Sequence, residues 1–186
     1  IGTTAAWLGE TRTRVLATLM DNAAAFVVLD EAARRAGAVH VPLAPFFTPA
    51  QTMHALQAAG VDTLVVDAPF AARLPGLLWS PFTSPFTSPF TSPIASPIAS
   101  PITTAGRALM QTRLAHSPVP LPPGTEKVTF TSGSTGAPKG VCLSGNAMQS
   151  VADGLVGALA PLDIERHLNA LPFSVLLENV AGVMAP

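Results

Sequence analysis

Arg14-Val-Leu-Ala-Thr-Leu-Met20 is a short apolar run that ends at the turn-forming pair Asp21-Asn22. Two similar runs follow along the chain, Ala38-Val-His-Val-Pro-Leu43 and Asp62-Thr-Leu-Val-Val-Asp67. Short aliphatic and β-branched runs between turn residues are typical of buried strands. Residues 14–67 are therefore predicted to contain three strands.

Helical signals fill the two gaps between these strands. Helix-forming residues occupy Ala23–Ala36, and Gly37 follows as the expected C-terminal cap. The second helix is expected to open with the capping box Thr48-Pro-Ala-Gln51, with proline at the first helical position, and to end at Gly60. The resulting βαβαβ order predicts an α/β fold whose parallel strands are joined by right-handed crossovers.

The composition limits both the size and the partners of the chain. Its 186 residues suffice for one domain or a piece of one. The formal net charge of -1 leaves no basic footprint for nucleic acid. Apolar residues make up 48% of the chain and charged residues only 11%. This composition indicates that part of the apolar surface is covered by additional sequence.

The sequence also bears on membranes and on the cellular compartment. No uninterrupted apolar run reaches the roughly 18 residues of a spanning helix, so no integral membrane segment is expected. The chain begins at Ile1 without a signal-like segment; we expect the natural start to be absent and the location to be cytoplasmic. The single cysteine, Cys142, cannot form an internal disulfide and is expected to be a small buried residue.

Residues 80–103 are six four-residue units that each begin with Ser-Pro. A proline at every fourth position excludes helix and favours a polyproline-like or disordered segment. We interpret the repeat as a tolerated low-complexity insertion; a phosphorylation tract or docking ligand is the alternative. The chain thus divides into an N-terminal α/β subdomain at 1–79, the repeat and a Pro-rich linker at 80–124, and a third part at 125–186.

The third part returns to regular structure. Three apolar runs predict strands at Lys127–Thr131, Val141–Leu143 and His167–Leu171. A helix is expected over Ala147–Ala160, interrupted by Gly154 and Gly157, with either Ser144 or Asn146 as its cap.

Between the first two of these strands lies Thr129-Phe-Thr-Ser-Gly-Ser-Thr-Gly-Ala-Pro-Lys-Gly-Val141. Glycines let successive amides converge on an anion, hydroxyls add donors, and a lysine supplies positive charge. The residues that offer these groups are Thr131, Ser132, Gly133, Ser134, Thr135, Gly136 and Lys139. The loop is therefore predicted to bind a polyphosphate.

Other interpretations of the chemistry are weaker. The phosphate loop of ordinary nucleotide hydrolases needs Gly-Lys followed by Ser or Thr and a helix, whereas Lys139 here precedes Gly140 and a strand. Neither Ser132 nor Ser134 lies in the Gly-x-Ser-x-Gly elbow of a nucleophile. The histidines show no metal-ligand spacing.

Residues 131–141 resemble the signature motif of the adenylate-forming superfamily, which comprises acyl-CoA synthetases, peptide-synthetase adenylation domains and luciferases. The family pattern is Thr-Ser-Gly-Thr/Ser-Thr-Gly-x-Pro-Lys-Gly-Val, and every position is satisfied. Residues 14–66 are similar to the family's N-terminal subdomain. The resemblance covers most of the chain except the repeat.

The resemblance implies an ATP-dependent acid–thiol ligase. In such enzymes a carboxylate attacks the α-phosphate of ATP, pyrophosphate leaves, and the acyl-adenylate passes to the thiol of coenzyme A or of phosphopantetheine. Mg²⁺ is implied as well. The segment Thr131–Lys139 would hold the β- and γ-phosphates, a role of positioning and charge stabilisation.

A second family element aligns in part with Leu171-Pro-Phe-Ser-Val175. Relatives often place histidine or an aromatic residue where this chain has Ser174 and Val175, which puts a carboxylate-pocket role in doubt. The next residues, Leu-Leu-Glu-Asn-Val, resemble acyl-CoA synthetases for aliphatic acids. Glu178 could bind metal or substrate, but a solvated or helix-capping role is preferred.

Later family elements are expected beyond Pro186: a Tyr-Gly-x-Thr-Glu segment, an aspartate for the ribose, and a C-terminal domain with a catalytic lysine. We therefore predict an incomplete N-terminal domain of an adenylate-forming enzyme that does not complete the reaction alone. A non-catalytic nucleotide-binding remnant and an interaction protein acting through the repeat are the alternatives.

Overall fold

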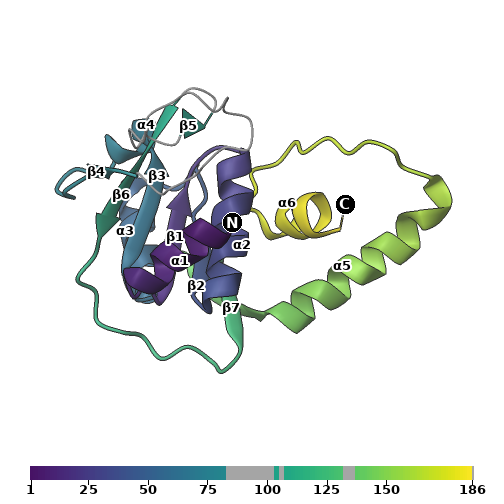
Figure 1. Cartoon of the computed structure of the whole chain (residues 1–186), viewed down its shortest axis with the longest axis horizontal. Coiled ribbons are helices and arrows are strands. Elements are labelled where there is room, and N and C mark those ends of the chain that lie inside the picture. Colours follow the sequence, from purple (N-terminus) through teal and green to yellow (C-terminus); the bar gives the residue numbers. More distant parts are fainter. Residues whose placement is uncertain (83–102, 105–106, 132–136, 186) are drawn as a thin grey trace.

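The computed structural model describes residues 1–82, 103–104, 107–131 and 137–185. Its sheet has the strand order β4 (Ser80–Pro81), β6 (Arg107–Arg113), β3 (Thr63–Asp67), β1 (Val15–Leu19), β2 (Val39–Pro42), β7 (Thr125–Thr131) and β8 (Lys139–Ser144). Strand β5 (Thr103–Thr104) pairs with β6, and Figure 1 labels β1 to β7. Most of the Ser-Pro repeat lies outside the described residues, so its expected polyproline-like conformation stays a prediction.

The predicted βαβαβ unit forms the centre of the sheet. Its elements are β1 (Val15–Leu19), α2 (Ala24–Ala36), β2 (Val39–Pro42), α3 (Pro49–Ala58) and β3 (Thr63–Asp67). Strand β1 pairs in parallel with both β2 and β3. The predicted parallel core is therefore confirmed, with β1 between its two neighbours.

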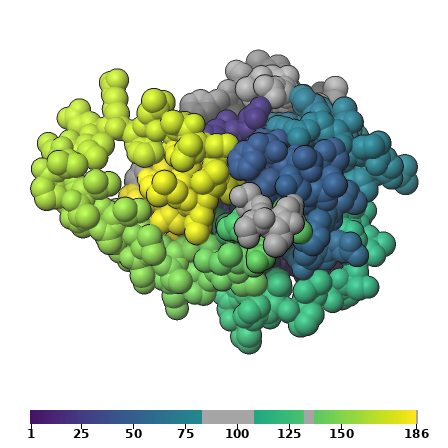
Figure 2. All heavy atoms as spheres, turned by 180° about the vertical axis from the view of Figure 1, so that it is seen from behind, coloured from purple at the N-terminus to yellow at the C-terminus, as the bar shows by residue number. Residues whose placement is uncertain are grey.

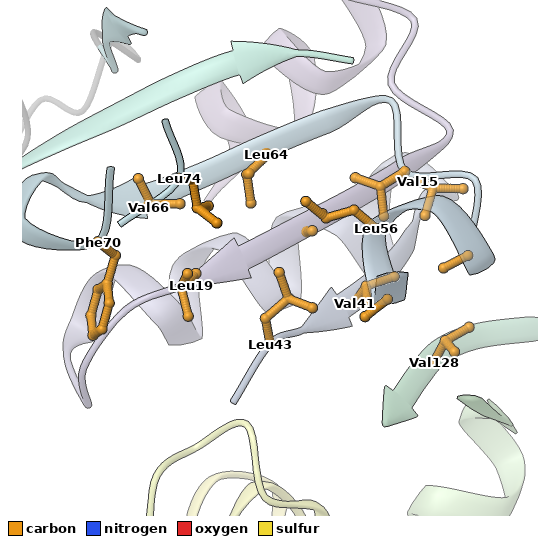
Figure 3. Close-up of a cluster of buried hydrophobic side chains, with 14 residues drawn as sticks. Val15, Leu19, Val41, Leu43, Leu56, Leu64, Val66, Phe70, Leu74 and Val128 are labelled. Carbon is orange, nitrogen blue, oxygen red and sulfur yellow. The ribbon is translucent and has the colours of Figure 1, made fainter. Parts of the chain in front are cut away.

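Alternation along β1 supplies the two faces of this core. Val15 and Leu19 belong to the apolar cluster shown in Figure 3, which includes Leu56 of α3. Leu16 belongs to a second apolar cluster on the opposite face, with residues of α1 (Gly2–Glu10) and α2. Successive side chains of a strand point to opposite faces, so a strand covered by helices on both sides is apolar throughout. The continuous apolar runs in the sequence have this cause.

The predicted C-terminal cap of α2 and the predicted capping box of α3 are confirmed, whereas α3 ends at Ala58, two residues before the predicted Gly60. Gly37 closes α2 in the left-handed conformation, with φ of 68°. At α3, the Thr48 Oγ1 accepts a hydrogen bond from the Gln51 amide at 3.2 Å, and the Gln51 Oε1 accepts one from the Thr48 amide at 3.0 Å. These reciprocal bonds are the capping box read from the sequence.

The β3 side of the sheet carries elements that the sequence analysis did not assign. Strand β6 (Arg107–Arg113) runs antiparallel to β3, and two short strands, β4 (Ser80–Pro81) and β5 (Thr103–Thr104), pair with β6. A short helix, α4 (Ala68–Ala71), follows β3. Leu109 of β6 is fully buried, so this strand completes the core at that edge.

The opposite side of the sheet ends in a β-hairpin. Strand β7 (Thr125–Thr131) pairs in parallel with β2, and β8 (Lys139–Ser144) runs antiparallel to β7. Both predicted strands are confirmed, and each is longer than the apolar run that indicated it. The predicted hairpin therefore lies at the edge next to β2.

The C-terminal part differs from its prediction in two places. Helix α5 (Gly145–Leu159) runs through both glycines without interruption, because they face open space and nothing displaces the backbone there. The strand predicted at His167–Leu171 is wrong: these residues have no helix or strand, and Leu168 is 85% exposed with no neighbouring strand to pair with.

Helix α5 is capped by Ser144, which resolves the alternative with Asn146. It continues into the 3-10 turn η1 (Ala160–Leu162), and an extended segment then returns to α6 (Leu176–Asn179) and the π-helix η2 (Val180–Met184) (Figure 1). Across the described part of the chain, helices of the length and apolarity needed to cross a membrane do not occur.

Candidate functional site

The Ser- and Gly-rich loop joins β7 to β8. Thr131 and Lys139 are register partners at the loop end of the hairpin, and both are exposed. The two ends of the predicted phosphate-binding motif are thus held opposite each other. Ser132, Gly133, Ser134, Thr135 and Gly136 lie outside the described residues, so their predicted contacts remain a proposal.

Gly140 is required by close packing within the hairpin. A Cβ at this position would lie 3.2 Å from ring atoms of Phe130 and 3.2 Å from Val128 Cγ1. Phe130 packs against the core cluster that contains Val128, so its ring has little room to move. The glycine after Lys139 therefore leaves room for the Phe130 ring, a role that differs from binding an anion.

His54 ties the C-terminal end of the loop to α3. Its Nε2 lies 3.1 Å from the carbonyl oxygen of the buried Pro138, next to Lys139. A carbonyl oxygen can only accept, so Nε2 carries the proton and donates. Sequence reasoning examined His54 only as a metal ligand; the partner is 84 residues away in the chain and could not be inferred from spacing.

A buried polar network lies beneath β7. Lys127 Nζ donates to Asp30 Oδ2 at 2.8 Å and also to Asn179 Oδ1, and His40 Nδ1 lies 2.6 Å from Asp30 Oδ1. The other ring nitrogen of His40, Nε2, lies 2.9 Å from Thr18 Oγ1. These five residues come from strands and helices that are distant in sequence, and sequence reasoning did not connect them.

The protonation states in this network follow from burial and charge. Burial lowers the pKa of His40 against the opposing effect of Asp30, so the ring is neutral and donates from Nδ1 to the carboxylate. Burial alone would raise the pKa of Asp30, but hydrogen bonds from His40 and Lys127, together with the charge of Lys127, hold it below its usual value. Asp30 and Lys127 thus form the ion pair.

A cavity of 570 Å³ lies on the same side as this network, between α2, β7, α5 and η2. Asp30 and Lys127 line it, together with Glu31, Arg34, Glu126 and Met184 among others. Thr131 and Lys139 are not among its lining residues. The described ends of the loop and this cavity are therefore separate features.

Two other predictions about single residues are corrected. Cys142 is exposed, because it lies on β8 at the edge of the sheet, where one side of the strand has no cover. Glu178 is buried with 8% exposure, and its Oε1 lies 3.7 Å from His167 Nε2, so it is not solvated. Within the described ranges, no group of three or more His, Cys, Asp or Glu side chains could hold a metal ion.

The chain combines a parallel α/β core with a hairpin at the edge of the sheet, whose connecting segment is rich in Ser and Gly. The family model described as AMP-binding enzyme matches residues 3–186, and the chain belongs to this family. No curated protein sequence shows a significant match.

Solved structures share the fold. The chain resembles the amide bond synthetase McbA from Marinactinospora thermotolerans, with a TM-score of 0.58 and 24% identity over 98% of this chain. It also resembles ATP-bound MatB from Rhodopseudomonas palustris, with a TM-score of 0.64 and 18% identity over 99% of this chain. The o-succinylbenzoate coenzyme A synthetase MenE from Bacillus subtilis, in complex with AMP, has a TM-score of 0.57 and 20% identity over 96% of this chain.

The chain spans 36% of the length of McbA, 36% of MatB and 44% of MenE. With the mixed α/β sheet, this partial coverage confirms the predicted fold class, an incomplete N-terminal domain of the adenylate-forming fold. Activity and substrates do not follow from a likeness at these identities.

Proposed function

We propose that Thr131–Lys139 binds the triphosphate of ATP, in an enzyme that activates a carboxylate as an acyl-adenylate and releases pyrophosphate. The observation that carries the proposal is the hairpin, which sets the exposed Thr131 opposite the exposed Lys139 at the two ends of a complete family motif. Membership of the AMP-binding enzyme family supports it.

The chemistry of the loop suits the β- and γ-phosphates. In this proposal Thr131, Ser132, Ser134 and Thr135 donate hydroxyl hydrogen bonds, the amides near Gly133 and Gly136 converge on phosphate oxygens, and the Lys139 ammonium offsets their charge. Donors that are fixed before ATP arrives stabilise the charge on departing pyrophosphate without reorganising.

Mg²⁺ fits this site only as a companion of the nucleotide. Residues 131–139 contain no carboxylate, the side chain that usually anchors Mg²⁺ in proteins, but they leave phosphate oxygens available to the ion. We therefore propose that the ion enters on the phosphates of ATP, where it would reduce their negative charge. The loop residues then hold the complex in place.

The acid and the acceptor belong to the proposal as well. We infer a carboxylic-acid substrate, aliphatic by the resemblance of residues 176–180, and a thiol acceptor, either coenzyme A or phosphopantetheine. The structures of this fold include an amide bond synthetase and a coenzyme A synthetase, so the fold alone fits more than one acceptor.

The test compares ATP–Mg²⁺ affinity in the full chain and in Lys139→Met by isothermal titration calorimetry. We expect the dissociation constant to rise about tenfold or more, because a charge-assisted contact to phosphate is lost. Arg166→Met is the control, since Arg166 is an exposed cation of the C-terminal segment, and it should bind ATP as the unmodified chain does. Equal affinity in Lys139→Met would overturn the proposal.

Two further measurements bear on the alternatives, and only a positive exchange result separates an active enzyme from a remnant. ATP–pyrophosphate exchange by the chain would exclude a non-catalytic remnant; we expect binding without exchange, because the proposed contacts reach only the phosphates. Removing residues 84–99, four whole repeat units, keeps β4 and β5 and should leave ATP affinity unchanged. Loss of binding after this deletion would favour a function of the repeat.

A further inference from the structure

The hairpin is joined to the rest of the sheet by little backbone pairing. Among the described residues, β7 meets β2 in one register pair, His40 with Lys127, whereas β1 and β2 are paired from Val15 to Thr18. Two paired strands are held together by a series of successive hydrogen bonds, so a single register pair restrains the position of β7 against β2 only weakly. Side-chain contacts therefore add to this pairing: Val128 lies in the apolar core cluster, and Lys127 lies in the buried polar network.

The register pair itself carries the buried polar network. Lys127 of β7 and His40 of β2 both contact the Asp30 carboxylate of α2, at 2.8 and 2.6 Å. Asn179 of α6 accepts a hydrogen bond from Lys127 through its Oδ1, and its Nδ2 donates one to Asp30 Oδ2 at 3.4 Å. One carboxylate thus joins the hairpin, the neighbouring strand and the C-terminal helix.

Burial gives this network its strength. Lys127 is 3% exposed, His40 and Asn179 are each 1% exposed, and the Asp30 side chain is 15% exposed. Because His40 is neutral, the single negative charge of Asp30 is balanced by the single positive charge of Lys127. Removing one member of such a pair leaves an uncompensated buried charge, which is far more costly than losing an exposed pair.

The position of Lys127 relates the network to the loop. Lys127 and Thr131 lie on the same strand, four residues apart, and even spacing puts them on the same face of β7. Any shift of β7 along or away from β2 would therefore move Thr131, the first residue of the phosphate-binding motif, by the same amount.

We propose that Lys127, with Asp30 as its counter-ion, is a positioning residue that fixes the β7–β8 hairpin and thereby the geometry of the ATP loop. Its effect on ATP rests on the proposed function, whereas its effect on the hairpin does not. The pair acts through the strand and does not touch the nucleotide.

Amide hydrogen exchange of the full chain tests the proposal without nucleotide. Lys127→Met and Asp30→Asn should each reduce protection of β7 and β8 amides about tenfold more than protection of β1 and β3 amides. The double variant Lys127→Met/Asp30→Asn should regain part of the loss, since no unpaired charge stays buried. If Lys127→Met fails to fold, the double variant and Asp30→Asn still give this comparison.

The control is Asp62→Asn on the far side of β1. Asp62 is also a buried carboxylate, 6% exposed, and its Oδ2 accepts from the Arg14 and Val15 amides at 3.0 and 3.3 Å. Asp62→Asn should lower the exchange protection of hairpin and core amides alike. A uniform loss in Lys127→Met, matching that of Asp62→Asn, would overturn the positioning role.

ATP titration of the same variants separates the two proposals. Lys127→Met should weaken ATP binding about tenfold, and Asp62→Asn should not. If the unmodified chain binds no ATP, the proposed function fails while the exchange result still decides the role of Lys127. If Lys139→Met loses ATP but the hairpin shows no excess exchange in Lys127→Met, the positioning role fails alone.

Discussion

The N-terminal core, residues 1–67, and the C-terminal region, residues 125–185, are held together in different ways. In the core, buried apolar clusters cover both faces of β1 to β3, which are paired along their length. In the C-terminal region, β7 joins the sheet at one described register pair, and the junction combines the apolar Val128 with the buried Lys127–Asp30 ion pair. Figure 2 shows the green and yellow C-terminal segments gathered on one side of the molecule.

The two regions also differ in where their apolar side chains lie. Leu16, Leu29 and Leu64 of the core are fully buried, whereas Leu168 is 85% and Leu162 66% exposed. Apolar burial is the main favourable term in folding. The comparison therefore indicates that the core contributes most of the stability, and that the C-terminal region depends on fewer and more specific contacts.

Matched leucine truncations give the largest expected effect. Leu16→Ala should reduce the free energy of unfolding by about 2–5 kcal/mol, because a buried side chain is lost and a cavity remains. Leu168→Ala should change it by less than about 0.5 kcal/mol. Urea denaturation of both variants measures the difference, and similar losses in the two would contradict the contrast between the regions.

The same contrast explains what could be predicted from the sequence. The core strands were predictable because strands buried on both faces are apolar at every position, and the capping box and Gly37 mark helix ends by local chemistry. Strand β6 was missed because Arg107, Gln111 and Arg113 leave only a short apolar run at its centre. The strand also lies between the repeat and the Pro-rich linker, where no regular structure was expected.

At the candidate site, features set by residues close in sequence were predictable, whereas contacts between residues distant in sequence were not. The hairpin and the pairing of Thr131 with Lys139 follow from the motif and its flanking strands. The contacts of His54 with Pro138, and of Lys127 with Asp30, join residues 84 and 97 positions apart. Such pairs depend on how the elements pack, which neither composition nor spacing records.

Acid titration should sharpen the comparison through the buried network. The pKa of His40 is lowered in the folded protein by burial, so as pH falls below 6.5 the unfolded chain binds a proton that the folded chain does not. Stability should therefore decrease from pH 7 toward acid, by at most about 1.4 kcal/mol per pH unit for one proton. Urea denaturation at several pH values measures this slope.

His40→Gln should flatten that slope, while His116→Gln, on the linker beside β3, should retain it. Asp30 adds a second phase at lower pH. Its pKa is below the usual 3.8 when folded, so its contribution is present above 3.8 and is lost as pH falls further. A slope between pH 7 and 5 that persists in His40→Gln would assign the effect to another group.

Two glycines test packing in the hairpin against packing in α5. Gly140→Ala should destabilise the chain by about 1–2 kcal/mol, because its Cβ would press on Phe130 and Val128. Gly154→Ala faces open space within a helix and should stabilise by about 0.5–1 kcal/mol. Thermal unfolding of the two variants measures both signs, and a stabilising Gly140→Ala would refute the close packing of Phe130 and Val128 on Gly140.

The smallest expected difference concerns the two helix caps. Thr48→Ala removes a reciprocal capping box at α3, which packs on the core, and should cost about 1 kcal/mol. Ser144→Ala removes one bond of 3.3 Å at α5, where most side chains are exposed, and should cost about half as much. Denaturant midpoints compare the two variants.

Because α5 is stabilised by few buried contacts, α5 can melt while the core stays folded. Circular dichroism measures this: in Ser144→Ala the helical signal should begin to fall before the main unfolding transition, and in Thr48→Ala it should not. Such a difference would show that the two regions unfold separately.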